Sequence, residues 1–260
     1  IWTIRNGVRG PTLAAQPSAA PVSSHVFTYW EGDPYPFTEL CLDSIGRVFG
    51  DRHKHLGPDS VSDWIDLPVR VRDSPHILFR SDYIRGELLR SHGGWWFDSD
   101  VILMKDPSEL VSDLVPRIWN LMYCVEGAWV ALVNCGILFS PMGAEWLERI
   151  MEDMRDVDPS GLGMTIDNED IGQDIYEKWS VGTGLCFVGD AHCFNSTVNV
   201  DADYRPFWDG VVGLSSVDYG LHIGASLSRW ASLAGDARAG DVLRASSLES
   251  LVTMFPESFV

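Results

Sequence analysis

The sequence predicts an α/β protein whose helices cover both faces of one sheet. Strand-like and helix-like patterns alternate along the chain after residue 24, which is typical of this class. The 260 residues suffice for one sizeable domain, and 45% apolar with 22% charged residues is normal for a globular protein. Ligands of such sheets collect at the carboxyl ends of the strands, where we expect the functional residues.

The first elements follow an N-terminal arm. Residues 1–24 are rich in Pro, Ala and Ser and predict a tail or extended arm, so that the domain proper spans residues 25–260. Residues 25–32, HVFTYWEG, predict the first strand, which ends near Trp30. Residues 37–49 predict a helix, and residues 59–72 predict a short strand with a polar loop.

A helix followed by a strand is the clearest local signal. Ser74 as N-cap and Pro75 at the first helical position predict the start of the helix, and Gly93–Gly94 its left-handed stop. Residues 95–97, WWF, then predict a short buried strand, and residues 101–104 predict its continuation.

The remaining elements are predicted by the same patterns. We expect a short helix or loop at 106–115, strands in 123–133, and a strand after Asn134 that leads into a helix at 142–154. A polar loop follows at 156–173. Further helices are predicted at 171–179 and 238–255.

Two charged pairs in this region suggest chemistry. Asp82 and Arg85 are three residues apart and share a helix face, while Asp98 and Asp100 are two apart and are expected to share a strand face. Carboxylates are the ligands that Mg²⁺ and Mn²⁺ prefer, often one or two of them together with substrate phosphates. Each pair has an ordinary alternative, because Asp-x-Asp recurs by chance in acidic chains and Asp82–Arg85 could be a surface ion pair.

The ordered combination resembles the sugar-binding region of glycosyltransferases of the GT-A fold that carry an Asp-x-Asp motif. The similar families are the family 32 mannosyltransferase-like enzymes, the capsular polysaccharide synthesis glycosyltransferases and the clostridial toxin glucosyltransferases. Seven positions match their pattern in order: Ser81, Asp82, Arg85, Gly93, Gly94, Asp98 and Asp100. The resemblance implies a mixed, mostly parallel sheet flanked by helices in a single domain.

Three weaker similarities extend the resemblance. It implies that Trp30, or less favourably Tyr29, stacks on the nucleotide base, and that Asn134 approaches the donor sugar. His222 would complete a metal shell formed by Asp100 and Asp98. The alternatives are that Trp30 is a core aromatic residue, Asn134 a turn residue and His222 a structural histidine.

The implied activity is metal-dependent transfer of a sugar from a UDP- or GDP-sugar to an acceptor hydroxyl, with retention of configuration. The acceptor would be a glycan, a polysaccharide or a glycoprotein, and the cofactor Mn²⁺ or Mg²⁺. The resemblance implies catalytic roles for Asp82, Arg85, Asp98 and Asp100. It implies donor contacts from Asp82, Arg85, Asp98 and Gly94. Three alternatives remain open: a phosphohydrolase of the haloacid dehalogenase type, a non-catalytic module that binds nucleotide-sugars, and hydrolysis of the donor without a true acceptor.

The net charge and the cysteine content bear on the partners of the protein and on its cellular compartment. A net charge of −18 disfavours nucleic acid as a partner. Five cysteines without a Cys-x-x-Cys pair predict buried thiols in a reducing compartment, hence a cytoplasmic protein, although an upstream segment could precede Ile1. No apolar run approaches the ~18 residues that a transmembrane helix needs.

Overall fold

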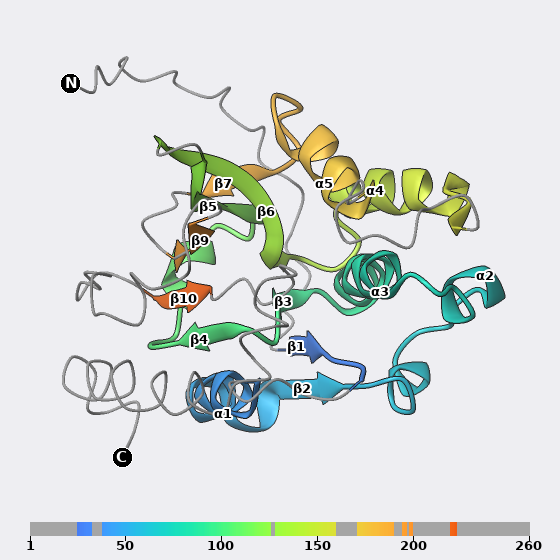
Figure 1. Cartoon of the computed structure of the whole chain (residues 1–260), viewed down its shortest axis with the longest axis horizontal. Coiled ribbons are helices and arrows are strands. Elements are labelled where there is room, and N and C mark those ends of the chain that lie inside the picture. The colour runs from blue at the N-terminus through green and yellow to red at the C-terminus, as the bar shows by residue number, and fades with distance from the viewer. Residues whose placement is uncertain are drawn as a thin grey trace.

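The computed structural model describes residues 25–32, 38–125, 128–159, 171–189, 194–196, 198–199 and 219–222. The predictions of an N-terminal arm at 1–24, of a loop over most of 156–173 and of a helix at 238–255 lie outside these residues. Within them, two sheets and several helices form the α/β architecture (Figure 1).

The larger sheet has seven strands in the order β2-β1-β3-β6-β5-β7, with β9 also paired to β5. Four of its pairings are parallel (β1–β2, β1–β3, β5–β7 and β5–β9), and the pairings of β6 with β3 and β5 are antiparallel. This confirms the mixed, mostly parallel sheet. Its strands are β1 (Val26–Tyr29), β2 (His53–Leu56), β3 (Gly94–Phe97), β5 (Arg117–Val125), β6 (Ala128–Ser140), β7 (Phe187–Gly189) and β9 (Val198–Asn199).

The smaller sheet corrects one prediction. Strand β4 (Val101–Leu103) does not continue β3 but pairs with β10 (Gly220–His222), which also pairs with β8 (Phe194–Ser196). The chain leaves the large sheet because residues 98–100 form a turn, which the Val101 N–H closes on the Asp98 carbonyl at 3.1 Å. On its other side β4 is held by α1 (Thr38–Phe49), where the Leu103 N–H donates to Ser44 Oγ at 2.9 Å.

Helices cover both faces of the large sheet, as predicted. Figure 1 shows α3 (Ile77–His92), α4 (Glu145–Asp156) and α5 (Ile171–Ser180) gathered on one side and α1 on the other. The strand expected in 59–72 is absent there: this segment holds a 3-10 helix (Val61–Asp63) and α2 (Val69–Arg72). The reason is local, since Gly57 and Pro68 carbonyls accept helical-type bonds from the residues that follow them. Shorter 3-10 helices occupy Gly50–Arg52 and Ser108–Val111.

Alternating side chains of the strands build two hydrophobic clusters. Phe27, Trp96 and Leu138 pack with α3, α4 and α5, whereas Trp95 and Phe97 pack with α1 and β4. This is the period of two expected of strands that are buried on both faces. This burial on both faces holds β3 in place and thereby determines the position of the turn at residues 98–100 that follows it.

Helix α3 begins later and ends where predicted. Its first residue is Ile77, because the Ser74 hydroxyl is used in a short turn, accepting from the His76 N–H at 3.1 Å. Gly93 and Gly94 have φ values of 66° and 104°, a conformation that favours glycine. A Cβ on Gly94 would lie 2.2 Å from the His25 carbonyl oxygen, so glycine also allows β3 to approach β1.

The order of the first three strands creates a switch point. The chain runs from β1 through α1 to β2 on one side, and then through α3 to β3 on the other side of β1. Crevices at the carboxyl ends of such strands are the usual ligand sites of open α/β sheets. Trp30 follows β1 and Asp98 follows β3, so both lie at this point.

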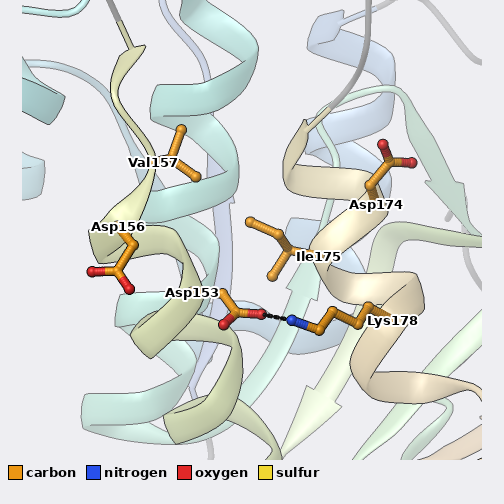
Figure 2. A pocket seen from close by; sticks show the side chains of 6 residues that line it. All are labelled: Asp153, Asp156, Val157, Asp174, Ile175 and Lys178. Atoms are coloured by element: carbon orange, nitrogen blue, oxygen red, sulfur yellow. Dashed lines mark hydrogen bonds and ion pairs between the residues drawn. The ribbon is translucent and has the colours of Figure 1, made fainter.

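A hollow of about 340 Å³ lies elsewhere, between the outer surfaces of α4 and α5 (Figure 2). Its rim carries Asp153, whose carboxylate accepts from Lys178 Nζ and Trp179 Nε1, each at 2.7 Å. Against the effect of burial, these bonds lower the pKa of Asp153. The hollow is lined by Asp153, Asp156, Val157, Asp174, Ile175 and Lys178 and so includes none of the predicted site residues.

Candidate functional site

The site is centred on a buried arginine. Arg85, on the sheet-facing side of α3, is 5% exposed, and its Nη2 lies 3.1 Å from Asp82 Oδ1 and 3.1 Å from Asp98 Oδ1. Its guanidinium also lies over the Trp96 ring, 5.1 Å from the centroid. Burial alone would lower the pKa of Arg85, but the neighbouring carboxylates raise it well above its usual range. The group is therefore a permanent buried cation.

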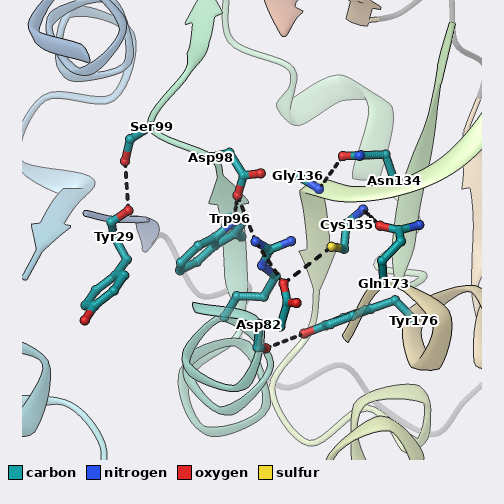
Figure 3. A network of polar contacts seen from close by, with 11 residues as sticks. Tyr29, Asp82, Trp96, Asp98, Ser99, Asn134, Cys135, Gly136, Gln173 and Tyr176 are labelled. Carbon is teal, nitrogen blue, oxygen red and sulfur yellow. Dashed lines mark hydrogen bonds and ion pairs between the residues drawn. The ribbon is translucent and has the colours of Figure 1, made fainter. Parts of the chain in front are cut away.

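The surface-pair alternative for Asp82 and Arg85 is wrong, because Asp82 is only 3% exposed. Asp82 Oδ1 also lies 3.6 Å from Cys135 Sγ, and its main-chain carbonyl accepts from the Tyr176 hydroxyl at 3.2 Å. Figure 3 shows these contacts converging from α3, β3, β6 and α5. Burial raises the pKa of Tyr176, which keeps its hydroxyl protonated as a donor.

Arg85 retains unused binding capacity. Its Nε and Nη1 atoms are buried and have no hydrogen-bond partner among the residues that the structure describes. A buried donor left unsatisfied costs roughly 1–3 kcal/mol, and more when it is charged. A ligand with oxygen acceptors, such as sugar hydroxyls or phosphates, would satisfy these donors.

Asp98 and Asp100 lie in the turn after β3 and not on a shared strand face, which corrects that prediction. Asp98 Oδ1 accepts from Trp96 Nε1 at 2.7 Å as well as from Arg85. Ser99 Oγ donates to the Tyr29 carbonyl at 3.0 Å and so ties the turn to the end of β1. Asp100 is 7% exposed and lies near α1, where burial first and the Asp100 charge second raise the pKa of the Cys41 thiol.

Asn134 is brought to the same place, although not as the first residue of a strand as expected. It lies within β6, and its Oδ1 accepts from the Gly136 N–H at 2.7 Å. A Cβ on Gly136 would lie 2.7 Å from Asn134 Oδ1 and 2.8 Å from Asp98 Oδ2. Glycine at this position therefore allows the Asn134 and Asp98 side chains to approach the β6 backbone closely.

The side chains gathered here are chemically suited to a divalent cation. Three nearby carboxylates, from Asp82, Asp98 and Asp100, exceed the single positive charge of Arg85, and hard oxygen donors suit Mg²⁺ or Mn²⁺. Among the described residues, no group of three or more His, Cys, Asp and Glu side chains is arranged to hold a metal. The backbone of His222, the predicted third ligand, pairs with Val101, which follows Asp100 in the chain.

The other predicted residues are placed as follows. Trp30 is partly buried directly after β1, and its main-chain N–H donates to the Leu56 carbonyl at 3.0 Å. The Tyr29 side chain is buried beside Glu31 and Arg80, and burial raises its pKa to about 12. Gly94 opens β3 and so lies at the opposite end of that strand from Asp98, roughly 10–13 Å away by strand rise. The structure thus brings together Asp82, Arg85, Asp98 and Asn134, with Asp100 in the same turn, but not Gly94.

Sequence reasoning missed several residues of this site. Trp96 could have been found, because it lies on the predicted strand only two residues before Asp98, to which its Nε1 donates. Cys135 and Gly136 adjoin Asn134. Gln173 and Tyr176 lie on α5, about 90 residues from Asp82 and Arg85, and no local pattern connects them to that pair.

Other sequence expectations can be compared with the described residues. Cys41, Cys135 and Cys186 are buried thiols, as predicted. No helix in the described part of the chain combines the length and apolar character required to cross a membrane.

A family comparison covers the region that holds most of this site. Residues 25–115 match the model of a family described as capsular polysaccharide synthesis protein. This confirms, over those residues, the predicted resemblance to that family. No curated protein matches the chain.

Solved structures show a more distant likeness. One is a glycosyltransferase involved in the glycosylation of the major capsid of PBCV-1, with 14% identity and a TM-score of 0.47 over 84% of this chain and 97% of the other. Another is the apo form of the glycosyltransferase GlyE of Streptococcus pneumoniae TIGR4, also with 14% identity and a TM-score of 0.47, over 87% of this chain and 64% of GlyE.

Proposed function

We propose that this protein is a glycosyltransferase of the GT-A type that moves a sugar from a UDP- or GDP-sugar to an acceptor hydroxyl. The acceptor would be a glycan, a polysaccharide or a glycoprotein. The observation that carries the proposal is Arg85, a buried cation between Asp82 and Asp98 with two donors directed to no described partner. Its place within the segment that matches the capsular polysaccharide synthesis family supports a carbohydrate substrate.

Each residue of the site would have a separate role in binding the donor, according to its chemistry. Arg85 Nε and Nη1 would donate to oxygens of the donor, while Asp82 would accept from sugar hydroxyls and fix the orientation of the ring. Trp30, at the end of β1, would stack on the nucleotide base. Asn134 would contact the donor sugar from β6. The low exposure of Asp82 and Arg85 would exclude water from these contacts and strengthen them.

The cofactor would be Mn²⁺ or Mg²⁺, held by Asp100 and Asp98 with His222 as a further ligand. Bound there, it would supply positive charge to the diphosphate leaving group. Arg85 would provide the second positive charge at this place in an otherwise acidic protein. The anomeric centre would pass through an oxocarbenium-like state, and we propose retention of its configuration.

A panel of UDP- and GDP-sugars, incubated with and without Mn²⁺, tests the proposal. We expect metal-dependent release of nucleotide diphosphate from one donor, and Asp100→Ala should abolish it. Phosphate release from simple phosphomonoesters without release from any nucleotide-sugar would contradict the proposal and favour a phosphohydrolase. Tight binding of a donor without turnover would contradict it in favour of a binding module.

A further inference from the structure

Strand β6 carries a bulge of three extra residues beside the candidate site. In its pairing with β5, Ile118 lies opposite Leu138, but the next residue, Trp119, lies opposite Asn134. Three residues of β6, Cys135 to Ile137, therefore have no counterpart on β5. Bulges of this kind redirect side chains and are frequent next to active sites.

The bulge is connected directly to the turn after β3. The Asp98 N–H donates to the Gly136 carbonyl at 2.8 Å, and the Gly136 N–H donates to Asn134 Oδ1 at 2.7 Å. The Asn134 side chain is thereby held close to the Asp98 carboxylate. Its position depends on the backbone shape of the bulge, because the side chain bonds to the bulge itself.

One side chain from α5 fixes that backbone on both sides of Asn134. Gln173 Nε2 donates to the Val133 carbonyl. Gln173 Oε1 accepts from the Cys135 N–H at 2.9 Å (Figure 3). Alternate residues of a strand direct their main-chain groups to the same side, so one amide can span both. The Gln173 amide thus supplies the donor and acceptor that a peptide group of a neighbouring strand would supply.

Helix α5 is itself fixed against α3 at the same level. A Cβ on Gly172 would lie 2.0 Å from Asp82 Oδ2, so only glycine permits this approach. One turn later, the Tyr176 hydroxyl donates to the Asp82 carbonyl at 3.2 Å. The Gln173 backbone is therefore held between two contacts to the Asp82 segment, and its amide links that segment to the bulge.

We propose that Gln173 is a positioning residue of the donor site, which acts through Asn134 by fixing the β6 bulge. The role rests on the proposed sugar transfer, in which Asn134 contacts the donor. Without the Gln173 amide, the bulge would relax and Asn134 would occupy its productive position for less of the time. Turnover should then fall more than donor affinity does.

A double-mutant cycle tests the coupling. Gln173→Met keeps the length of the side chain but removes both hydrogen bonds, and we expect kcat for nucleotide diphosphate release to fall about 10-fold with less than about a 3-fold change in KM. In an Asn134→Ala background, the same substitution should change kcat less than about 2-fold. Multiplicative effects of the two substitutions, or a Gln173→Met variant with wild-type kcat, would overturn the proposal.

The neighbouring residue provides a matched control. Asp174 is exposed on the same turn of α5 and lines the separate hollow between α4 and α5. Asp174→Asn should leave kcat unchanged and should show no coupling to Asn134→Ala in the double-mutant cycle. An Asp174→Asn effect as large as that of Gln173→Met would mean that any disturbance of α5 lowers the rate, which contradicts a specific role for Gln173.

Hydrogen exchange separates this inference from the proposed function. In Gln173→Met, the Cys135 amide should exchange at least about 10-fold faster, while the amides of α4 keep their wild-type rates. Wild-type protein that releases no nucleotide diphosphate from any donor would refute the transferase proposal alone, because the exchange result is independent of turnover. Unchanged exchange at Cys135 would refute the role of Gln173 in fixing the bulge.

Discussion

At the scale of single residues, the decisive fact is that Arg85 is buried while its sequence pattern resembles that of an exposed pair. Glu87 and Arg90 on the same helix have the same spacing, and Arg90 also contacts Glu148, yet the Arg90 side chain is 27% exposed. Asp82 and Arg85 differ because they face β3 and β6. The spacing i,i+3 predicts that two side chains can meet, but only the packing of the helix decides whether water surrounds them.

This contrast gives a stability prediction. Arg85→Met should lower the free energy of unfolding by about 3–5 kcal/mol, because the buried Asp82 carboxylate would lose the cation that compensates its charge. Arg90→Met should lower it by no more than about 1 kcal/mol, since partly exposed ion pairs contribute little. Urea denaturation of both variants measures the difference. Equal losses in the two variants would show that the buried Asp82–Arg85 pair contributes no more to stability than the partly exposed contacts of Arg90.

At the scale of elements, the start of β3 depends on a glycine. Gly94 combines a φ of 104° with the close approach of the His25 carbonyl, whereas Gly50 has a φ of 54° and open space around its Cα. Gly94→Ala should destabilise the fold by about 3 kcal/mol or more through strain and overlap, and Gly50→Ala by only about 1–2 kcal/mol through strain alone. Thermal or urea unfolding of the two variants tests this difference. A Gly94→Ala variant as stable as Gly50→Ala would contradict the tight packing of β3 on β1.

Strands β1 and β2 share a polar contact that predicts pH-dependent stability. Thr28 Oγ1 lies 3.0 Å from His53 Nε2 and 3.0 Å from His55 Nδ1. Burial, followed by the nearby His55 and Lys54, lowers the pKa of His53 to about 4, and burial also lowers the pKa of His55. These histidines are therefore neutral in the folded protein at pH values where they would be charged in the unfolded chain.

The sign follows from the pKa values of the two states. The pKa of His53 is lower in the folded protein than the value of 6.5 in the unfolded chain. Above pH 6.5 His53 is neutral in both states, and its titration therefore does not reduce the free energy of unfolding. As the pH falls from about 6.5 towards 4, stability should decrease by up to ~1.4 kcal/mol per pH unit for this one group. Urea midpoints at pH 7.5 and 5.0 measure the loss, and His53→Gln should reduce it relative to wild type. An identical pH dependence in His53→Gln would exclude His53 as its source.

The sequence predicted the part of the site that is contiguous in the chain. Asp82, Arg85, the glycine stop and the acidic pair all lie within one helix–strand unit, whose spacing limits where its residues can be. The departures have long-range causes. Residues 98–100 turn away from the large sheet because β4 pairs with β10 and is bonded to α1. Asn134 lies at the site because β6 has a bulge there, to which the Gln173 amide of α5 is hydrogen-bonded. Contacts between such distant segments leave no local pattern in the sequence.

At the scale of the whole molecule, the strand order explains why one site gathers residues from so many elements. Helix α1 connects β1 to β2 on one face of the sheet and α3 leads into β3 on the other, which opens the carboxyl ends of β1 and β3 to a ligand. The turn that carries Asp98 and Asp100 closes one side, and β6 with α5 closes the other. The acidic character of the protein, with a net charge of −18, makes the Arg85 cation and the proposed divalent ion the local sources of attraction for a diphosphate.

The most direct test of the central claim compares two arginines of α3 in the nucleotide diphosphate release assay. Arg85→Lys keeps the buried charge but loses the planar set of donors, and we predict that kcat/KM for the donor falls at least about 10-fold. Arg90→Lys, on the same helix, should stay within about 2-fold of wild type. Wild-type rates in a folded Arg85→Lys variant would contradict the assignment of the Asp82–Arg85–Asp98 centre as the donor site.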